Sequence, residues 1–169
     1  MYNFYNLNHD QLQSENANYA VVDVNVPLDN IDFYQLFETY MNDPSEANQD
    51  QLGLYLNKIN YLIGFFPNSK DEYTPEQTTL TIKSQDDLNL LICSNEDREV
   101  FLPCFISTKE LRAWCKEPVY TLSVPAAWLW KFVLSQNNYK GIIFNPGSIG
   151  WSITLEHIQS LLDDINQQK

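Results

Sequence analysis

Positive charge is scarce in this chain and missing from its N-terminal third. The 169 residues include 22 acidic and ten basic side chains, which gives a formal net charge of −12. The first Lys or Arg is Lys58, so residues 1–57 carry nine acidic side chains and no basic one. Proteins that bind nucleic acids neutralise phosphates with Lys and Arg, and we therefore expect no nucleic-acid partner. A basic protein partner would instead be attracted electrostatically.

Cysteine and long apolar segments are also in short supply. The three cysteines are odd in number and show no Cys-x-x-Cys spacing, which predicts reduced thiols in a cytosol rather than a disulfide framework. The longest apolar segment, residues 124–134, contains Pro125 and Lys131 and is too short to span a bilayer. No charged and apolar leader follows Met1. We therefore predict a cytoplasmic protein without a membrane partner.

Glycine and histidine are too few for the common catalytic motifs. Five glycines form neither a P-loop nor a dinucleotide-binding fingerprint. A nucleophile–base pair of Ser148 or Cys104 with His157 has no nucleophile elbow to support it. The cysteines lie eleven residues apart, without the spacing of a zinc site. We predict a non-enzymatic protein without metal or cofactor.

The first two thirds of the chain predict a tail, two helices and a group of strands. Residues 1–18 are polar and aperiodic, as in a flexible tail. Residues 19–26 alternate in polarity as a strand does, and helical spacing follows twice before residue 60. Apolar or alternating runs at 60–66, 78–83, 88–93 and 100–106 then predict antiparallel strands.

Helices and strands alternate in the last third. Ser107 and Glu110 have the spacing of a helix capping box, and Thr154 is placed to cap the last helix. Between them we expect strands at 119–124, 141–145 and 149–153 and a helix at 126–135. The order predicts an α+β fold with one mixed, mainly antiparallel sheet and helices packed over it. We expect residues 19–169 to form a single domain.

Asn145-Pro146-Gly147 ends a predicted strand. Pro at the second and Gly at the third position are typical of a type II turn, in which Gly supplies the positive φ. A turn alone explains the motif. The alternative is that Asn145 and its neighbours line a recognition surface at the strand end.

The predicted helix at 126–134 is apolar on nearly all sides, with Lys131 as its one charged residue. Such a helix is either enclosed or presents an apolar surface to a partner. Trp128 and Trp130 lie two positions apart and point in different directions, so we expect one of them in the core and the other at a partner or homodimer surface. The candidate interaction surface comprises Phe105, Trp114, Trp128, Trp130, Asn145, Pro146, Gly147 and Trp151.

Two stretches carry a resemblance to a known family. Residues 100–114 (VFLPCFISTKELRAW) describe a strand leading into a capped helix, and residues 141–148 (GIIFNPGS) describe a strand ending in the Asn-Pro-Gly turn. In this order the chain resembles the N-terminal domain of the SseB family, named for enhanced serine sensitivity, best over 60–164. The resemblance implies an α+β fold and no defined biochemical activity. Longer members carry a second, C-terminal domain, for which we expect no room here.

Three functions remain open. The first is a non-enzymatic SseB-like module that binds another protein. The second is an acidic immunity-type or inhibitor protein that neutralises a basic toxin or enzyme, which the charge of residues 1–57 favours. The third is a small-molecule sensor linked to serine or amino-acid metabolism, which only the family's name suggests.

Overall fold

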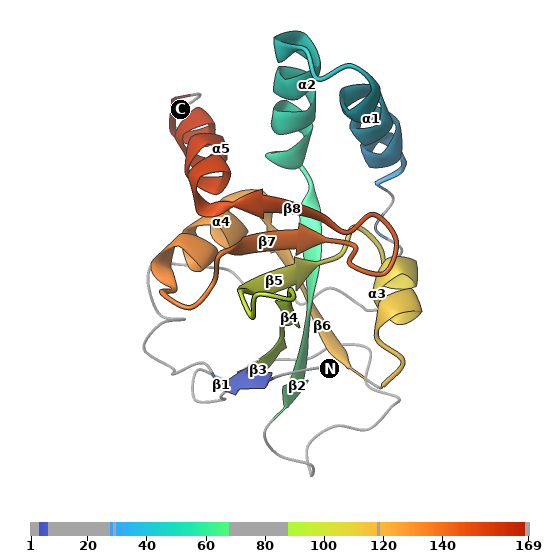
Figure 1. The fold of residues 1–169 in the computed structure, drawn as a ribbon, viewed down its shortest axis with the longest axis vertical. Helices are drawn as coiled ribbons and strands as arrows, with labels where there is room; N and C mark the ends of the chain where they lie inside the picture. The colour runs from blue at the N-terminus through green and yellow to red at the C-terminus, as the bar shows by residue number, and fades with distance from the viewer. Residues whose placement is uncertain (1–3, 7–27, 29, 68–87, 118, 168–169) are drawn as a thin grey trace.

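The residues that the structure describes form an α+β fold of two small sheets and five helices. The computed structural model describes residues 4–6, 28, 30–67, 88–117 and 119–167. Figure 1 shows α1, α2 and α5 together at one end of the molecule, next to the β7–β8 side of one sheet, while β1 and β3 lie at the other end. The α+β class predicted from the sequence is therefore confirmed.

The first sheet is antiparallel and has the order β1-β3-β2-β6. Its members are β1 (Phe4–Asn6), β3 (Leu88–Leu91), β2 (Asn60–Pro67) and β6 (Tyr120–Pro125). β2 pairs along its length with β6, from Asn60 opposite Pro125 to Phe65 opposite Tyr120. β1 lies within the segment predicted as a tail, and the remainder of that segment lies outside the described residues.

The second sheet is mixed and has the order β4-β5-β7-β8. It consists of β4 (Cys93–Ser94), β5 (Val100–Cys104), β7 (Gly141–Phe144) and β8 (Trp151–Thr154). β5 and β7 are parallel, and the other two pairs are antiparallel. Because β5 and β7 are parallel, their carboxyl ends lie at the same edge of the sheet, where the Asn-Pro-Gly turn begins.

The single predicted sheet is corrected to these two sheets. The chain leaves β3 after Leu91 and enters β4 at Cys93, so the apolar run at 88–93 is shared between them. An isolated antiparallel bridge between Leu62 and Phe105 links the sheets. The strands predicted at 19–26 and 78–83 lie outside the described residues.

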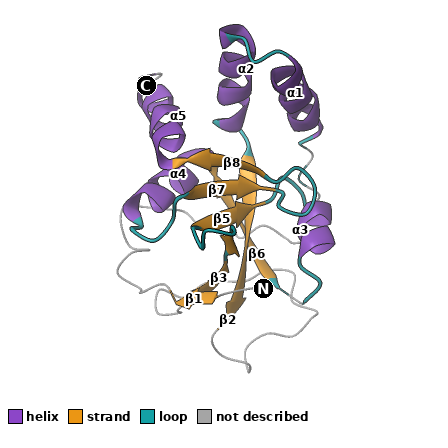
Figure 2. Cartoon of the chain, in the orientation of Figure 1, coloured by secondary structure: helices purple, strands orange, loops and turns teal. Residues whose placement is uncertain are grey.

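The helices are α1 (Ile31–Asn42), α2 (Glu46–Leu56), α3 (Thr108–Trp114), α4 (Ala126–Ser135) and α5 (Leu155–Gln167). Figure 2 shows α3 and α4 on opposite sides of the strands, while α1, α2 and α5 lie at one end. Phe33 anchors α1 in the core and lies 6.1 Å from Phe144 of β7, ring centre to ring centre. Met41, near the end of the same helix, is 59% exposed. None of the helices in the described ranges has the length and apolar character that crossing a membrane requires.

Candidate functional site

The Asn-Pro-Gly motif forms a turn of a different type from the one predicted, with Asn145 buried and Gly147 exposed. The Ser148 N–H donates to the Asn145 carbonyl at 2.9 Å, which closes the turn. Positive φ occurs at Asn145 (43°) and not at Gly147, so the turn is not type II. A Cβ on Gly147 would lie 3.1 Å from the Cβ of Trp114. Gly147 therefore serves the close approach of the turn to α3.

Asn145 connects the ends of the two parallel strands. Its Oδ1 accepts from the Ile106 N–H at 3.2 Å, and its own N–H donates to the Cys104 carbonyl at 2.9 Å. Its side chain is fully buried, and Nδ2 has no partner among the described residues. These bonds hold the start of α3 against the end of β7, which is a structural role.

Glu110 joins three elements at the same edge of the sheet. The Tyr34 hydroxyl of α1 donates to its Oε1 at 2.6 Å, and the Ser148 hydroxyl donates to its Oε2 at 2.5 Å. Ser107 caps α3 as predicted, with its Oγ accepting from the Glu110 N–H. Burial, followed by the hydrogen bond to Glu110 and the charge of that carboxylate, raises the pKa of Tyr34 well above its usual value.

The candidate residues chosen from the sequence lie at separate places. Phe105, Asn145 and Gly147 gather around Trp114 and the strand ends, whereas Trp128 and Trp130 lie on α4. Phe105, Trp130 and Asn145 are each 0% exposed. These three side chains are enclosed in this structure, whereas a partner contacts side chains that are exposed. Pro146 and the remaining tryptophans are half-buried, and Gly147 is exposed.

Helix α4 buries Trp130 completely and leaves Trp128 half-buried. The Nε1–H of Trp130 donates to Asn57 Oδ1 at 2.8 Å inside the core. Trp128 is half-buried and stacks on Phe132 with their ring centres 5.0 Å apart. The fully buried Trp130 leaves Trp128 as the one member of the pair that a partner could contact.

The nucleophile and base considered from the sequence have other partners. His157 Nδ1 lies 2.8 Å from the Thr154 hydroxyl, while Ser148 bonds to Glu110. Burial raises the pKa of the Cys104 thiol well above its usual value, which disfavours the thiolate. Within the described ranges, no three or more His, Cys, Asp and Glu side chains are grouped to hold a metal ion.

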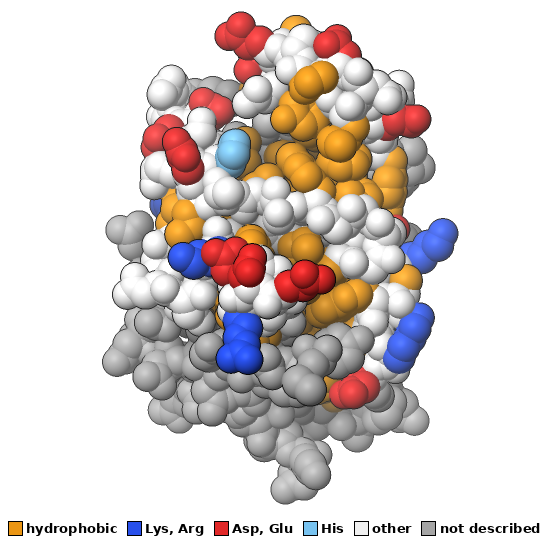
Figure 3. All heavy atoms as spheres, viewed as in Figure 1, with side chains coloured by type: hydrophobic (Ala, Val, Ile, Leu, Met, Phe, Trp, Pro, Cys, Tyr) orange, Lys and Arg blue, Asp and Glu red, His pale blue; other side chains and the backbone are white. Residues whose placement is uncertain are grey.

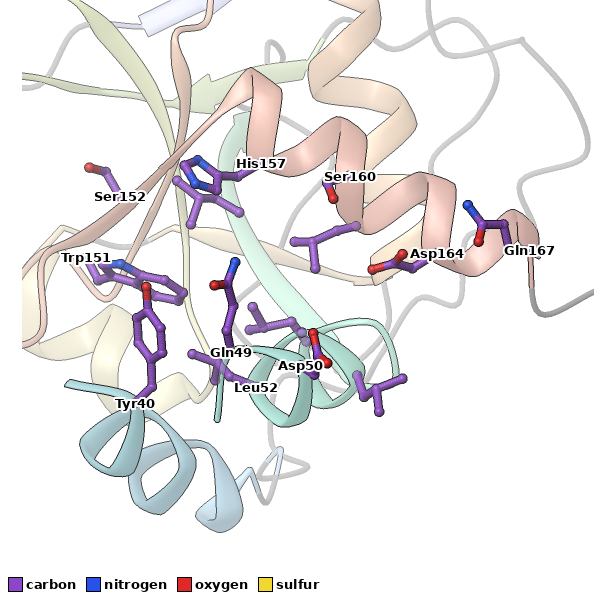
Figure 4. A pocket seen from close by; sticks show the side chains of 15 residues that line it. Tyr40, Gln49, Asp50, Leu52, Trp151, Ser152, His157, Ser160, Asp164 and Gln167 are labelled. Carbon is purple, nitrogen blue, oxygen red and sulfur yellow. The ribbon is translucent and has the colours of Figure 1, made fainter. Parts of the chain in front are cut away.

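A cleft between α2 and α5 was not anticipated from the sequence. Its volume is about 530 Å³, within the range of ligand and peptide sites. Figure 4 shows Tyr40 and Trp151 at one end of it and Gln167 at the other. The lining residues come from α1 (Tyr40), α2 (Gln49, Asp50, Leu52, Gly53, Leu54, Leu56), β8 (Trp151, Ser152, Ile153) and α5 (His157, Ser160, Leu161, Asp164, Gln167).

The lining of the cleft combines apolar and polar side chains, and its Asp residues have no Lys or Arg among them. Leu54 is 44% exposed although it is a large apolar side chain, and Leu161 is half-buried on the opposite wall. Asp50 of α2 and Asp164 of α5 are the charged lining residues. Figure 3 shows apolar side chains at this end of the molecule, with a histidine and acidic side chains beside them. A cleft of this composition is suited to an apolar ligand that also carries positive charge.

Asn57, the residue that follows α2, bonds to both α5 and α4 beside the cleft. Its Nδ2 donates to the Leu161 carbonyl of α5 at 2.9 Å, while its Oδ1 accepts from Trp130 of α4. Trp151 lies with Tyr40 at one end of the cleft. Its ring packs 5.1 Å from the ring of Phe37 and 5.3 Å from the ring of Phe144, centre to centre. The bonds of Asn57 and the ring contacts of Trp151 thus connect the walls of the cleft to the core.

The architecture is that of a small α+β domain in which two sheets support a helix-walled cleft. A model of the SseB protein N-terminal domain matches residues 38–160. The chain belongs to the SseB family, and the match includes all of α2. No curated protein and no solved structure matched the chain.

Proposed function

We propose that this SseB-like protein is a non-enzymatic module that binds another protein through the cleft between α2 and α5. The observation that carries the proposal is Leu54, a leucine 44% exposed at an otherwise braced cleft. Exposed apolar surface framed by polar side chains is typical of interaction sites. Trp151 and Tyr40 add aromatic surface, which is enriched where binding energy concentrates.

Affinity capture with paired variants tests this function. The tagged protein, Leu54→Asn and Met41→Asn are each used to capture partners from the native lysate. Both substituted side chains are exposed and apolar, but Met41 lies outside the cleft. We expect a stoichiometric partner that Leu54→Asn loses and Met41→Asn retains. A partner that all three proteins retain would place the binding surface elsewhere.

A small-molecule ligand is the alternative that the volume of the cleft favours, since about 530 Å³ accommodates a metabolite. A thermal-shift screen with serine and related amino acids tests it. Millimolar ligand that binds the folded state should raise the melting temperature of the wild-type protein, and Leu54→Asn should reduce the rise. An unchanged melting temperature with all of these compounds would exclude them as ligands of the cleft.

An acidic inhibitor of a basic toxin or enzyme is a second protein-binding candidate. The acidic character of α1 and α2 supports it, because these helices contain no Lys or Arg. Attraction between charged surfaces weakens as salt screens them. Capture of a basic partner that is released at raised ionic strength would favour this candidate over an uncharged partner.

A further inference from the structure

We infer that the occupant of the α2–α5 cleft is an amphipathic helix with basic residues beside its apolar face, supplied by a partner protein. The inference rests on the proposed function and specifies the partner's chemistry. Three observations on the described residues carry it: the direction in which the cleft runs, the distribution of charge on its walls, and the apolar side chains inside it.

The lining follows the length of the two helices. On α5 it runs from His157 to Gln167 at helical spacing, with Ser160, Leu161 and Asp164 between them. Ten residues of helix rise about 15 Å, which is nearly three turns. β8 contributes only three consecutive residues at the floor. An elongated groove between two helices is the shape that a third helix fills.

The charge of the walls is of one sign. Helices α1, α2 and α5 together carry seven Asp and Glu side chains and no Lys or Arg. Asp163 and Asp164 lie near the C-terminus of α5, where the helix dipole is already negative and no basic residue of the last turn offsets it. The carboxylates therefore repel one another and the negative end of the helix dipole. Lys or Arg side chains of a partner would reduce this repulsion.

A second copy of the chain fits this charge poorly. Two copies meeting at their clefts would bring acidic walls together, and like charges placed opposite each other weaken association. A basic helix instead pairs its cations with Asp50 and Asp164 while its leucine-like side chains contact Leu54 and Leu161. This arrangement corresponds to helix-in-groove recognition, in which residues at i, i+3, i+4 and i+7 act as anchors.

Labelled model peptides test the inference on the full chain. The first peptide has about 18 residues of leucine and lysine, with leucine at i, i+3, i+4 and i+7. The second has the same composition but alternates leucine with lysine, so it is amphipathic as a strand. The third keeps the helical pattern and replaces lysine with glutamate. We expect fluorescence anisotropy to detect tightest binding of the first peptide, with affinity falling as salt rises.

Paired charge variants locate the binding. The double variant Asp50→Asn/Asp164→Asn neutralises two lining carboxylates, and Asp32→Asn/Glu38→Gln neutralises two exposed carboxylates of α1 that do not line the cleft. Both lower the net negative charge equally. We expect the lining pair to weaken the first peptide about fivefold and the α1 pair less than about twofold, as for partly exposed ion pairs. Equal losses would show non-specific attraction and overturn the inference.

Other outcomes separate the inference from the proposed function. Tighter binding of the alternating peptide would identify an extended partner at β8, and binding of the glutamate peptide would remove the requirement for a basic partner. Absence of binding by the first peptide, or equal binding by Leu54→Asn, would also overturn the inference. In each case, a native partner lost on Leu54→Asn and retained on Met41→Asn would leave the proposed function standing.

Discussion

The Asn-Pro-Gly turn and the α2–α5 cleft differ in whether their side chains are buried and bonded within the chain or exposed to solvent. At the turn, Asn145 is buried and bonded to the chain's own backbone, and Trp114 packs directly on Gly147. At the cleft, Leu54 is exposed. Asp50 and Asp164 lie on helices that contain no Lys or Arg. The turn uses its residues to complete the fold, while the cleft leaves Leu54, Asp50 and Asp164 exposed to solvent.

The comparison predicts that substitutions at the turn change stability and that substitutions in the cleft change binding. Each of the following variants tests one side of it. The expected effects decrease from the buried turn, through the braces between the two regions, to the wall of the cleft.

Asn145→Ala should give the largest loss of stability. It removes the acceptor of the buried Ile106 N–H and places Ala at a φ of 43°. Together, a lost buried bond and a left-handed residue cost about 3 kcal/mol, after allowance for removal of the unpartnered Nδ2. Urea unfolding measures the loss. Asn145→Gly tolerates the φ and should lose less, while an unchanged urea midpoint in Asn145→Ala would contradict the structural role.

Trp130→Phe should destabilise the protein by about 2 kcal/mol, because it removes core volume and the bond from Nε1 to Asn57. Trp128→Phe is the matched control on the same helix and should lose less than about 1 kcal/mol, since this side chain is half-buried. Thermal unfolding compares the two variants. Equal losses would contradict the assignment of Trp130 as the buried brace.

The cleft is where sequence reasoning and structure part most clearly. Helical spacing was sufficient to predict α1, α4 and α5, because burial of one face repeats every three to four residues. The cleft instead combines α2 with β8 and α5, which follow α2 by about a hundred residues of sequence. Leu54 is one apolar residue on a helix that also buries Leu52 and Leu56. No local pattern distinguishes it, and its exposure follows only from how α2 is placed beside α5.

The two sheets and the turn were misjudged for a related reason. A continuous apolar run at 88–93 gives no sign that the chain changes sheet near Ile92, because Leu90, Leu91 and Ile92 are all buried and the apolar Cys93 follows directly. Asn-Pro-Gly has the residues of a type II turn, but contact with Trp114 determines the need for glycine. Tertiary packing decides these features, so local residue preferences could not.

Tyr34→Phe should alter the dependence of stability on high pH. The unfolded chain releases the Tyr34 proton near the usual pKa of 10.0, whereas the folded protein keeps it because burial and Glu110 raise that pKa. The folded state therefore loses stability as pH rises above 10, and removal of the hydroxyl should reduce this loss. Urea unfolding across that range measures it. Ser148→Ala is the control: it removes the other hydrogen bond to Glu110 but keeps the Tyr34 hydroxyl. Its free energy of unfolding should fall with pH above 10 as steeply as that of the wild-type protein.

Gly53→Ala should have the smallest effect on stability and the opposite sign. Gly53 lies inside α2, where alanine favours the helix by up to about 1 kcal/mol. A Cβ there would lie 3.5 Å from Leu161 Cδ2, an ordinary contact, so we expect a gain of about 0.5 kcal/mol. The same methyl group narrows the cleft between its two walls. Partner capture should therefore weaken while the melting temperature rises, and a variant that gains stability without losing the partner would show that the occupant does not reach the base of the cleft.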